Sequence, residues 1–85
     1  MDKRDRFAVN LRKARQKAGI SQEELATRCE LHRTEVSLLE RGGREPRLGT
    51  MVKLATALGT TPEQLCSGIT WDTKKRDYKV DDPPR

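Results

Sequence analysis

Apart from its many arginines and lysines, this 85-residue sequence contains few side chains that could catalyse a reaction or bind a metal ion. It contains one histidine, His32, and two cysteines, Cys29 and Cys66, and the further ligands of a zinc site are missing at any usual spacing. There is also no plausible nucleophile–base pair and no glycine-rich phosphate loop of the required pattern. We therefore expect no enzymatic activity, no metal and no cofactor, and we expect both cysteines to pack on apolar helix faces.

The excess of basic residues indicates anion binding instead. Lys and Arg number 18 against 13 acidic residues, which gives a net charge of +5. This balance favours polyanions, with nucleic acid first and an anionic membrane second. No apolar run approaches a membrane span, and the amino terminus MDKRDRF lacks the apolar segment of a signal peptide. We expect a cytoplasmic protein with reduced thiols.

The first element predicted to position these side chains is a helix from about Asp5 to Ala18. Its apolar stripe consists of Phe7, Leu11, Ala14 and Ala18. Arg6 belongs to the basic residues that are expected to surround this stripe, and Gly19 is well placed to end the helix.

The stretch that follows predicts two helices joined by a tight turn. Ser21 and Glu24 have the spacing of a reciprocal capping box, which predicts a helix over Gln22–Cys29. His32 and Glu35 repeat that spacing before a helix over about 33–41. Histidine is a poorer cap than serine, so this second start is inferred mainly from Glu35 and the apolar pair that flanks it, Leu31 and Val36.

Two further helices complete the predicted fold. A loop with two glycines and a proline, residues 42–47, precedes a helix from about Leu48 to Leu58. Thr61 as N-cap and Pro62 at the first helical position begin a fifth helix, which is expected to stop near Gly68. The predicted fold class is all-α, with five short helices.

The motifs SQEELA, LHRTEVSLLERG and P-x-L-x-T-x-x-K-L-A-x-A-L occur in this order. In these motifs the chain resembles the phage repressor and Cro-like helix-turn-helix family, also called the XRE family, over roughly residues 5–68. The resemblance implies a five-helix, lambda-repressor-like domain of bacterial or phage type whose third helix lies in the major groove of DNA. We assign residues 1–68 to this DNA-binding domain and residues 69–85 to a short C-terminal extension.

Base contacts are expected from the amino end of the third helix, which is the part that reaches base edges. The predicted residues are Arg33 and Thr34, followed one turn later by Ser37 and Leu38. Arg33 can bind guanine through two hydrogen bonds or only grip a phosphate. Leu38 can contact a thymine methyl group, or it can be a core or dimer residue. Glu35 either caps the helix or accepts a hydrogen bond from cytosine.

Phosphate contacts are expected on both sides of this helix. Gln22 can combine its side-chain amide with the exposed N–H groups at the start of the second helix. The basic residues around the following loop are predicted to bind phosphate, with a solvated loop as the alternative: Arg41, Arg44 and Arg47. The resemblance also implies a partly buried ion pair between Arg15 and Glu40, and Arg15 is a further candidate for phosphate contact.

The turn departs from the family pattern at one residue. Glu30 stands where glycine is usual, because the backbone there is left-handed. A non-glycine residue costs about 1 kcal/mol or somewhat more at such a position. We therefore expect a strained or differently shaped turn.

The C-terminal extension has a different pattern from the helices. Ile69 and Trp71 alternate with polar residues, as do Tyr78 and Val80 after the basic sequence TKKR. This alternation fits two short strands, as a hairpin or as an edge that pairs with a second chain. Alternatively, Ile69 and Trp71 cover the helices. The last five residues, DDPPR, are expected to be disordered.

These features predict a sequence-specific, double-stranded-DNA-binding transcriptional regulator, either a repressor or an activator. One recognition helix reads only a few base pairs, so we expect a homodimer on a palindromic operator. The expected location is the nucleoid in the cytoplasm. Two alternatives stay open: an antitoxin that binds DNA and holds a toxin protein through the C-terminal extension, and a protein-interaction module that has lost DNA binding.

Overall fold

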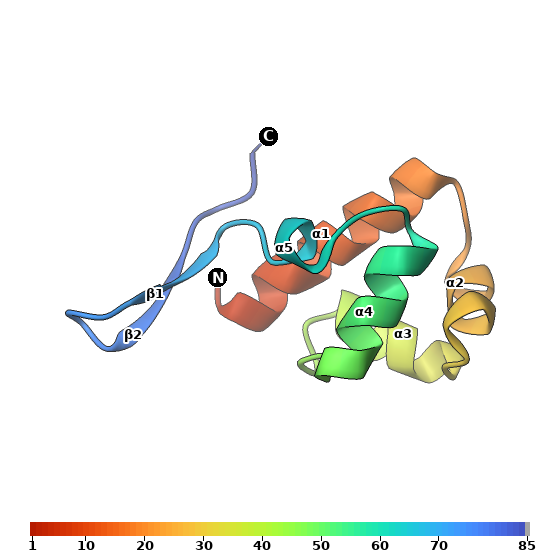
Figure 1. Ribbon diagram of the computed structural model, residues 1–85, viewed down its shortest axis with the longest axis horizontal. Helices are drawn as coiled ribbons and strands as arrows, with labels where there is room; N and C mark the ends of the chain where they lie inside the picture. Colours follow the sequence, from red (N-terminus) through yellow and green to blue (C-terminus); the bar gives the residue numbers. More distant parts are fainter. Residues whose placement is uncertain (85) are drawn as a thin grey trace.

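The computed structural model describes residues 1–84 and consists of five helices followed by a β-hairpin (Figure 1). The helices are α1 (Lys3–Ala18), α2 (Gln22–Cys29), α3 (Arg33–Glu40), α4 (Leu48–Ala57) and α5 (Pro62–Leu65). The strands β1 (Ile69–Asp72) and β2 (Asp77–Val80) pair antiparallel. The predicted five-helix fold is therefore confirmed, and the C-terminal extension forms the hairpin.

Local capping signals determine where the first helices begin. The Asp2 side chain accepts a hydrogen bond from the Asp5 N–H at 3.0 Å, so α1 begins at Lys3 and not at Asp5 as predicted. The Ser21 hydroxyl accepts from the Glu24 N–H at 3.0 Å and begins α2 at the predicted residue. Each cap joins residues within one helical turn, so neighbouring residues in the sequence are enough to predict it.

A single apolar core lies among the helices, and every helix contributes to it. The largest enclosed side chains are Leu11, Leu25, Val36, Leu39, Leu54 and Leu65. Burial of one such side chain contributes about 1.5–3 kcal/mol to folding. Ala18, which the predicted stripe included, is exposed. The apolar stripe of α1 therefore ends one turn before the helix does.

The connection from α5 to β1 is held against α1 by two polar side chains. Arg6 is only 5% exposed and its Nε donates to the Ser67 carbonyl oxygen at 2.9 Å, although the sequence placed Arg6 among the solvent-facing basic residues. Asn10 Nδ2 donates to the carbonyl oxygens of Leu65 and Ser67, both at 2.9 Å. These bonds use the carbonyl of Leu65, the last residue of α5, and that of Ser67 in the connection. The helix α5 therefore ends at Leu65 and not near Gly68.

The hairpin extends beyond the end of the helical bundle (Figure 1). Its register pairs Ile69 with Val80 and Trp71 with Tyr78. Ile69 packs against the core, whereas Trp71 is 52% exposed, so the covering role considered for both residues applies to Ile69 only. Residues 81–84 follow the hairpin without helix or strand. The disorder expected for Arg85 concerns a residue outside the described part of the chain.

Candidate nucleic-acid interface

The third helix has one buried face and one exposed face. Val36, Leu39 and Glu40 are buried against the bundle. Arg33 and Thr34, at the amino end of α3, are exposed. The core therefore fixes which face of α3 is available to a ligand.

The turn between α2 and α3 keeps the left-handed conformation that glycine usually provides. Glu30 has φ 53° and ψ 45°, and it ends α2. The Leu31 N–H donates to the Ala26 carbonyl oxygen at 2.9 Å, which closes the end of the helix. A left-handed glutamate costs about 1–2 kcal/mol relative to an ordinary backbone conformation. The turn thus has the usual geometry, at an energetic cost.

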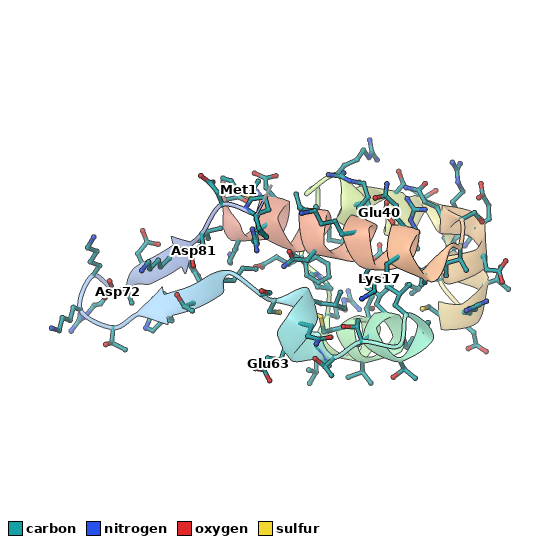
Figure 2. All side chains as sticks on the ribbon, turned by 90° about the horizontal axis from the view of Figure 1, so that it is seen from above. Met1, Lys17, Glu40, Glu63, Asp72 and Asp81 are labelled. Atoms are coloured by element: carbon teal, nitrogen blue, oxygen red, sulfur yellow. The ribbon has the colours of Figure 1, made fainter. Side chains whose placement is uncertain are left out.

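An ion pair joins α1 to α3 behind the exposed face. Arg15 Nε lies 2.6 Å from Glu40 Oε2, and Arg15 Nη2 lies 2.9 Å from Glu40 Oε1. The Glu40 side chain is 3% exposed and that of Arg15 is 15% exposed. The hydrogen bond to Glu40 raises the pKa of Arg15. Figure 2 shows Glu40 on α3 beside α1. This bidentate pair sets the position of α3 relative to α1.

Gln22 is tied to the same ion pair. Its amide Nε2 donates to Glu40 Oε1 at 3.2 Å. The side chain is therefore directed toward Glu40. A phosphate contact by this amide requires the exchange of that hydrogen bond, whereas the N–H groups at the start of α2 need no such exchange.

Two of the predicted DNA-binding arginines are held by acidic residues of the same chain. Arg33 Nε lies 2.8 Å from Glu23 Oε1, and both side chains are more than 60% exposed. Arg44 pairs with Glu35. A backbone N–H and the charge of Arg33 lower the pKa of Glu23. Each contact uses one nitrogen of the guanidinium, so the other N–H groups of Arg33 and Arg44 remain available to a phosphate or a base.

The position of Glu35 corrects its predicted role as a capping residue. Its carboxylate accepts from Arg44, nine residues later, and His32 makes no side-chain cap hydrogen bond. The start of α3 is instead supported by backbone bonds from Glu35 and Val36 to the His32 carbonyl oxygen, at 3.0 and 3.4 Å. Sequence spacing resembled a capping box here, but the tertiary partner of Glu35 is the loop arginine.

The remaining predicted contact residues differ in exposure. Arg41 and Arg47 are exposed, and Arg41 Nε donates to the Ser37 carbonyl oxygen at 3.3 Å. Ser37 and Leu38 are half-buried. The backbone of Gly43 lies close to the Leu38 side chain, since a Cβ added at Gly43 would be only 3.2 Å from Leu38 Cδ2. Leu38 therefore presents only part of its side chain at the surface.

Two residues near this face were missed by sequence reasoning. Glu23, in the first turn of α2, holds Arg33, and an acid at a helix start gave no signal for that partner. Arg12 Nη1 donates to the Glu40 carbonyl oxygen at 3.1 Å and satisfies the carboxyl end of α3. The sequence showed Arg12 only as one of several basic residues on α1.

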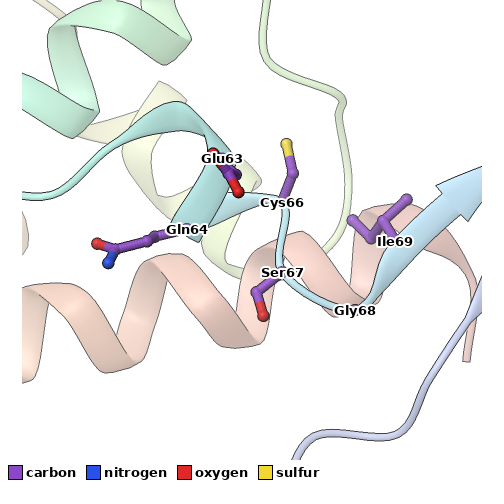
Figure 3. A pocket seen from close by; sticks show the side chains of 6 residues that line it. All are labelled: Glu63, Gln64, Cys66, Ser67, Gly68 and Ile69. Carbon is purple, nitrogen blue, oxygen red and sulfur yellow. The ribbon is translucent and has the colours of Figure 1, made fainter.

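Other parts of the described structure offer little for chemistry. A pocket follows the connection from α5 to β1 (Figure 3), and its lining residues are Glu63, Gln64, Cys66, Ser67, Gly68 and Ile69. Within residues 1–84, no group of three or more His, Cys, Asp or Glu side chains could hold a metal ion. Cys29 is buried and Cys66 half-buried, and burial raises the pKa of both thiols. No helix in this part of the chain is long and apolar enough to cross a membrane.

Comparisons with known proteins agree with this architecture. A family model described as helix-turn-helix matches residues 11–65. The control protein C.BamHI from Bacillus amyloliquefaciens is 43% identical over 65 residues, which cover 75% of this chain and 80% of that protein.

Two crystal structures are similar to this chain over most of its length. The restriction-modification controller protein C.AhdI from Aeromonas hydrophila is 42% identical with a TM-score of 0.70, and the match covers 73% of this chain and 94% of that one. The hypothetical transcription factor NHTF from Neisseria is 40% identical with a TM-score of 0.72, covering 88% of this chain and 82% of that one. The chain belongs to the XRE-type helix-turn-helix family of DNA-binding transcription regulators.

Proposed function

We propose that the chain is a sequence-specific, double-stranded-DNA-binding transcriptional regulator that inserts α3 into the major groove. The observation that carries this proposal is the division of α3 into a buried face with Val36 and Leu39 and an exposed amino end with Arg33 and Thr34. An α-helix fits the major groove, and residues near its amino end reach base edges. We assign base contacts to Arg33, Thr34, Ser37 and Leu38.

Phosphate contacts are assigned to the residues that border this helix: Gln22, Arg15, Arg41, Arg44 and Arg47. Exposed arginines after α3 suit one backbone, and the amino end of α2 suits the other. Contact with DNA uses the guanidinium N–H groups of Arg33 and Arg44 that Glu23 and Glu35 leave free, or it displaces these carboxylates. A guanine in the correct position gives Arg33 two hydrogen bonds to one base.

The relatives support a more specific role. C.BamHI is a control protein and C.AhdI is a restriction-modification controller. We propose that this chain likewise controls transcription of a restriction-modification system on the bacterial nucleoid. Its domain of residues 1–68 would act as a homodimer on a palindromic operator, since one recognition helix reads only a few base pairs.

The test is selection of bound sites from a random duplex library, followed by binding measurements on the selected site and on random DNA. Arg33→Ala should cost about 1–3 kcal/mol on the selected site and relax base preference at one position. Arg44→Ala should weaken both DNAs alike and lower the slope of log K against log salt by about one.

Arg28→Ala is the matched control for these variants. Like Arg33, Arg28 is an exposed arginine paired with a glutamate, but it lies in the last turn of α2. It should leave both affinities unchanged. The proposal is wrong if no sequence is enriched by the selection, or if Arg33→Ala and Arg44→Ala act identically on the selected site and on random DNA.

A further inference from the structure

The hairpin has one polar face and one apolar face. By register, Ile69, Trp71, Tyr78 and Val80 lie on the same face. The Trp71 and Tyr78 rings are 5.1 Å apart with an interplanar angle of 73°, yet Trp71 is 52% and Tyr78 50% exposed. The hairpin therefore carries two neighbouring aromatic rings on one face, and each side chain is about half exposed.

A two-stranded hairpin of this kind is marginally stable in water without a partner surface. The sheet in residues 1–84 has only these two strands, so neither strand has a neighbour on its outer edge. Among the described residues, Ile69 at the root of the hairpin packs against the core, and Lys3 Nζ of α1 lies 4.7 Å from the centroid of the Tyr78 ring. Half of each aromatic side chain still stays exposed. The exposed aromatic face is therefore suited to a partner.

The charge of the hairpin argues that this partner is a protein and not DNA. Residues 69–84 contain four basic side chains and four aspartates, so this segment is neutral although the whole chain carries +5. An arm that binds the phosphate backbone gains its affinity from an excess of lysine and arginine. The neutral segment lacks that excess.

The order of these charges makes the hairpin complementary to itself. The tip carries three basic residues, Lys74, Lys75 and Arg76, against Asp72 and Asp77 and is net basic by one charge, whereas Asp81 and Asp82 lie at the root. Lys75 comes three residues before Tyr78 and Asp81 three residues after it, each at most roughly 10 Å away along the strand direction. Figure 2 shows Asp72 at the far end of the hairpin and Asp81 at the end nearer the bundle.

A two-fold axis near Tyr78 would bring the basic tip of one hairpin onto the acidic root of the other. Such an interface is isologous, because each copy contributes the same patch. The aromatic residues then lie at its centre, where tryptophan and tyrosine contribute most to binding.

We propose that the hairpin face with Trp71 and Tyr78 binds the same face of a second copy of this chain, with the two hairpins antiparallel. This inference rests on the proposed function, because binding to a palindromic operator is what requires a dimer. The hairpin is anchored by Arg6 to Ser67 and by the Asp81 N–H to the Gly68 carbonyl oxygen at 2.9 Å. An anchored arm of this kind sets the distance between the two α3 helices and hence the spacing of the operator half-sites.

The first test measures the dimer dissociation constant of the full chain by sedimentation equilibrium. Trp71→Ala/Tyr78→Ala should weaken the dimer about ten-fold or more, because it removes both central side chains. The matched controls are Leu48→Ala and Val52→Ala, which remove exposed apolar side chains from α4 and should leave the dimer unchanged. Far-UV circular dichroism checks that each variant keeps its helices.

A charge-swap experiment tests the antiparallel arrangement. Lys74→Glu/Lys75→Glu makes tip and root acidic, and Asp81→Lys/Asp82→Lys makes both basic, so each variant alone should dimerise about ten-fold more weakly than the unmodified chain. A one-to-one mixture should recover the dimer, since each tip then meets a root of opposite charge. Loss of structure in either variant could not produce that recovery.

The inference is overturned if the unmodified chain is monomeric, if Trp71→Ala/Tyr78→Ala dimerises normally, if an α4 control dissociates the dimer, or if the mixture stays monomeric. Binding to the selected DNA site, measured in parallel, separates this result from the proposed function. Preference for that site over random DNA remains if only the hairpin interface is wrong. It is absent, even in the unmodified chain, if the proposed function is wrong.

Discussion

Replacing Arg15 by alanine would leave the Glu40 carboxylate buried without its counter-ion. Arg15 donates two hydrogen bonds to Glu40 and a third, from Nη1, to the Ile20 carbonyl oxygen at 3.0 Å. After the substitution, Gln22, at 3.2 Å, would be the one side chain among residues 1–84 that still donates a hydrogen bond to the Glu40 carboxylate. One amide cannot compensate a charge that is 97% enclosed, because burial without pairing costs several kcal/mol.

The structure sets the size of this effect. Removal of one partner from a buried ion pair costs about 3–5 kcal/mol. Arg15 keeps 15% exposure, so water can partly replace its guanidinium, and we expect the lower end of that range, about 3 kcal/mol. A chain of this length has a free energy of unfolding of about 4–13 kcal/mol. The melting temperature should fall by roughly 12–24 °C.

Urea unfolding followed by far-UV circular dichroism, at one fixed protein concentration, measures this loss. Arg28→Ala is the control, because the exposed Arg28–Glu24 pair should contribute less than about 0.5 kcal/mol. Arg15→Met/Glu40→Leu replaces both charges with apolar groups and should lie within about 1 kcal/mol of the unmodified chain. The reasoning is refuted if Arg15→Ala costs no more than Arg28→Ala, or if the double variant is less stable than Arg15→Ala.

Three other measurements test the backbone and the core. Glu30→Gly should raise the free energy of unfolding by up to about 1 kcal/mol, because it relieves the left-handed glutamate; unchanged stability would mean that the turn is not strained. Gly68→Ala should destabilise the chain more than Gly19→Ala, because both have positive φ but only the Cβ at Gly68 would meet Arg6, at 2.7 Å; equal losses would contradict this packing. Cys29 should react with iodoacetamide far more slowly in the folded chain than in urea near pH 8, since burial raises its pKa, and equal rates in mass spectrometry would contradict its burial.

The predictions of secondary structure are correct where the sequence signal lies within one helical turn. Ser21 and Glu24 are three residues apart, so the start of α2 was predicted correctly from the sequence. The family resemblance implied a left-handed backbone at Glu30, with a strained or a differently shaped turn as the two expectations, and the structure has the left-handed conformation. The predicted start of α1 at Asp5 is two residues late, because the N-cap is Asp2.

Side-chain partners farther apart were not predictable in the same way. Glu35 has the spacing of a capping residue, but it pairs with Arg44 across the loop after α3. Arg33 pairs with Glu23 on the preceding helix. Each pairing depends on the angle at which two elements pack, and no local pattern of the sequence encodes that angle.

Local signals are enough to predict the five helices, the exposed amino end of α3 and the basic character of the chain, because caps, apolar periodicity and charge can be read from neighbouring residues. Tertiary packing is needed to know that Arg6 is buried, that Leu38 is partly covered and that Trp71 stays exposed beside Tyr78. Burial depends on which distant segment passes over a side chain, and that is settled when the helices and the hairpin pack together.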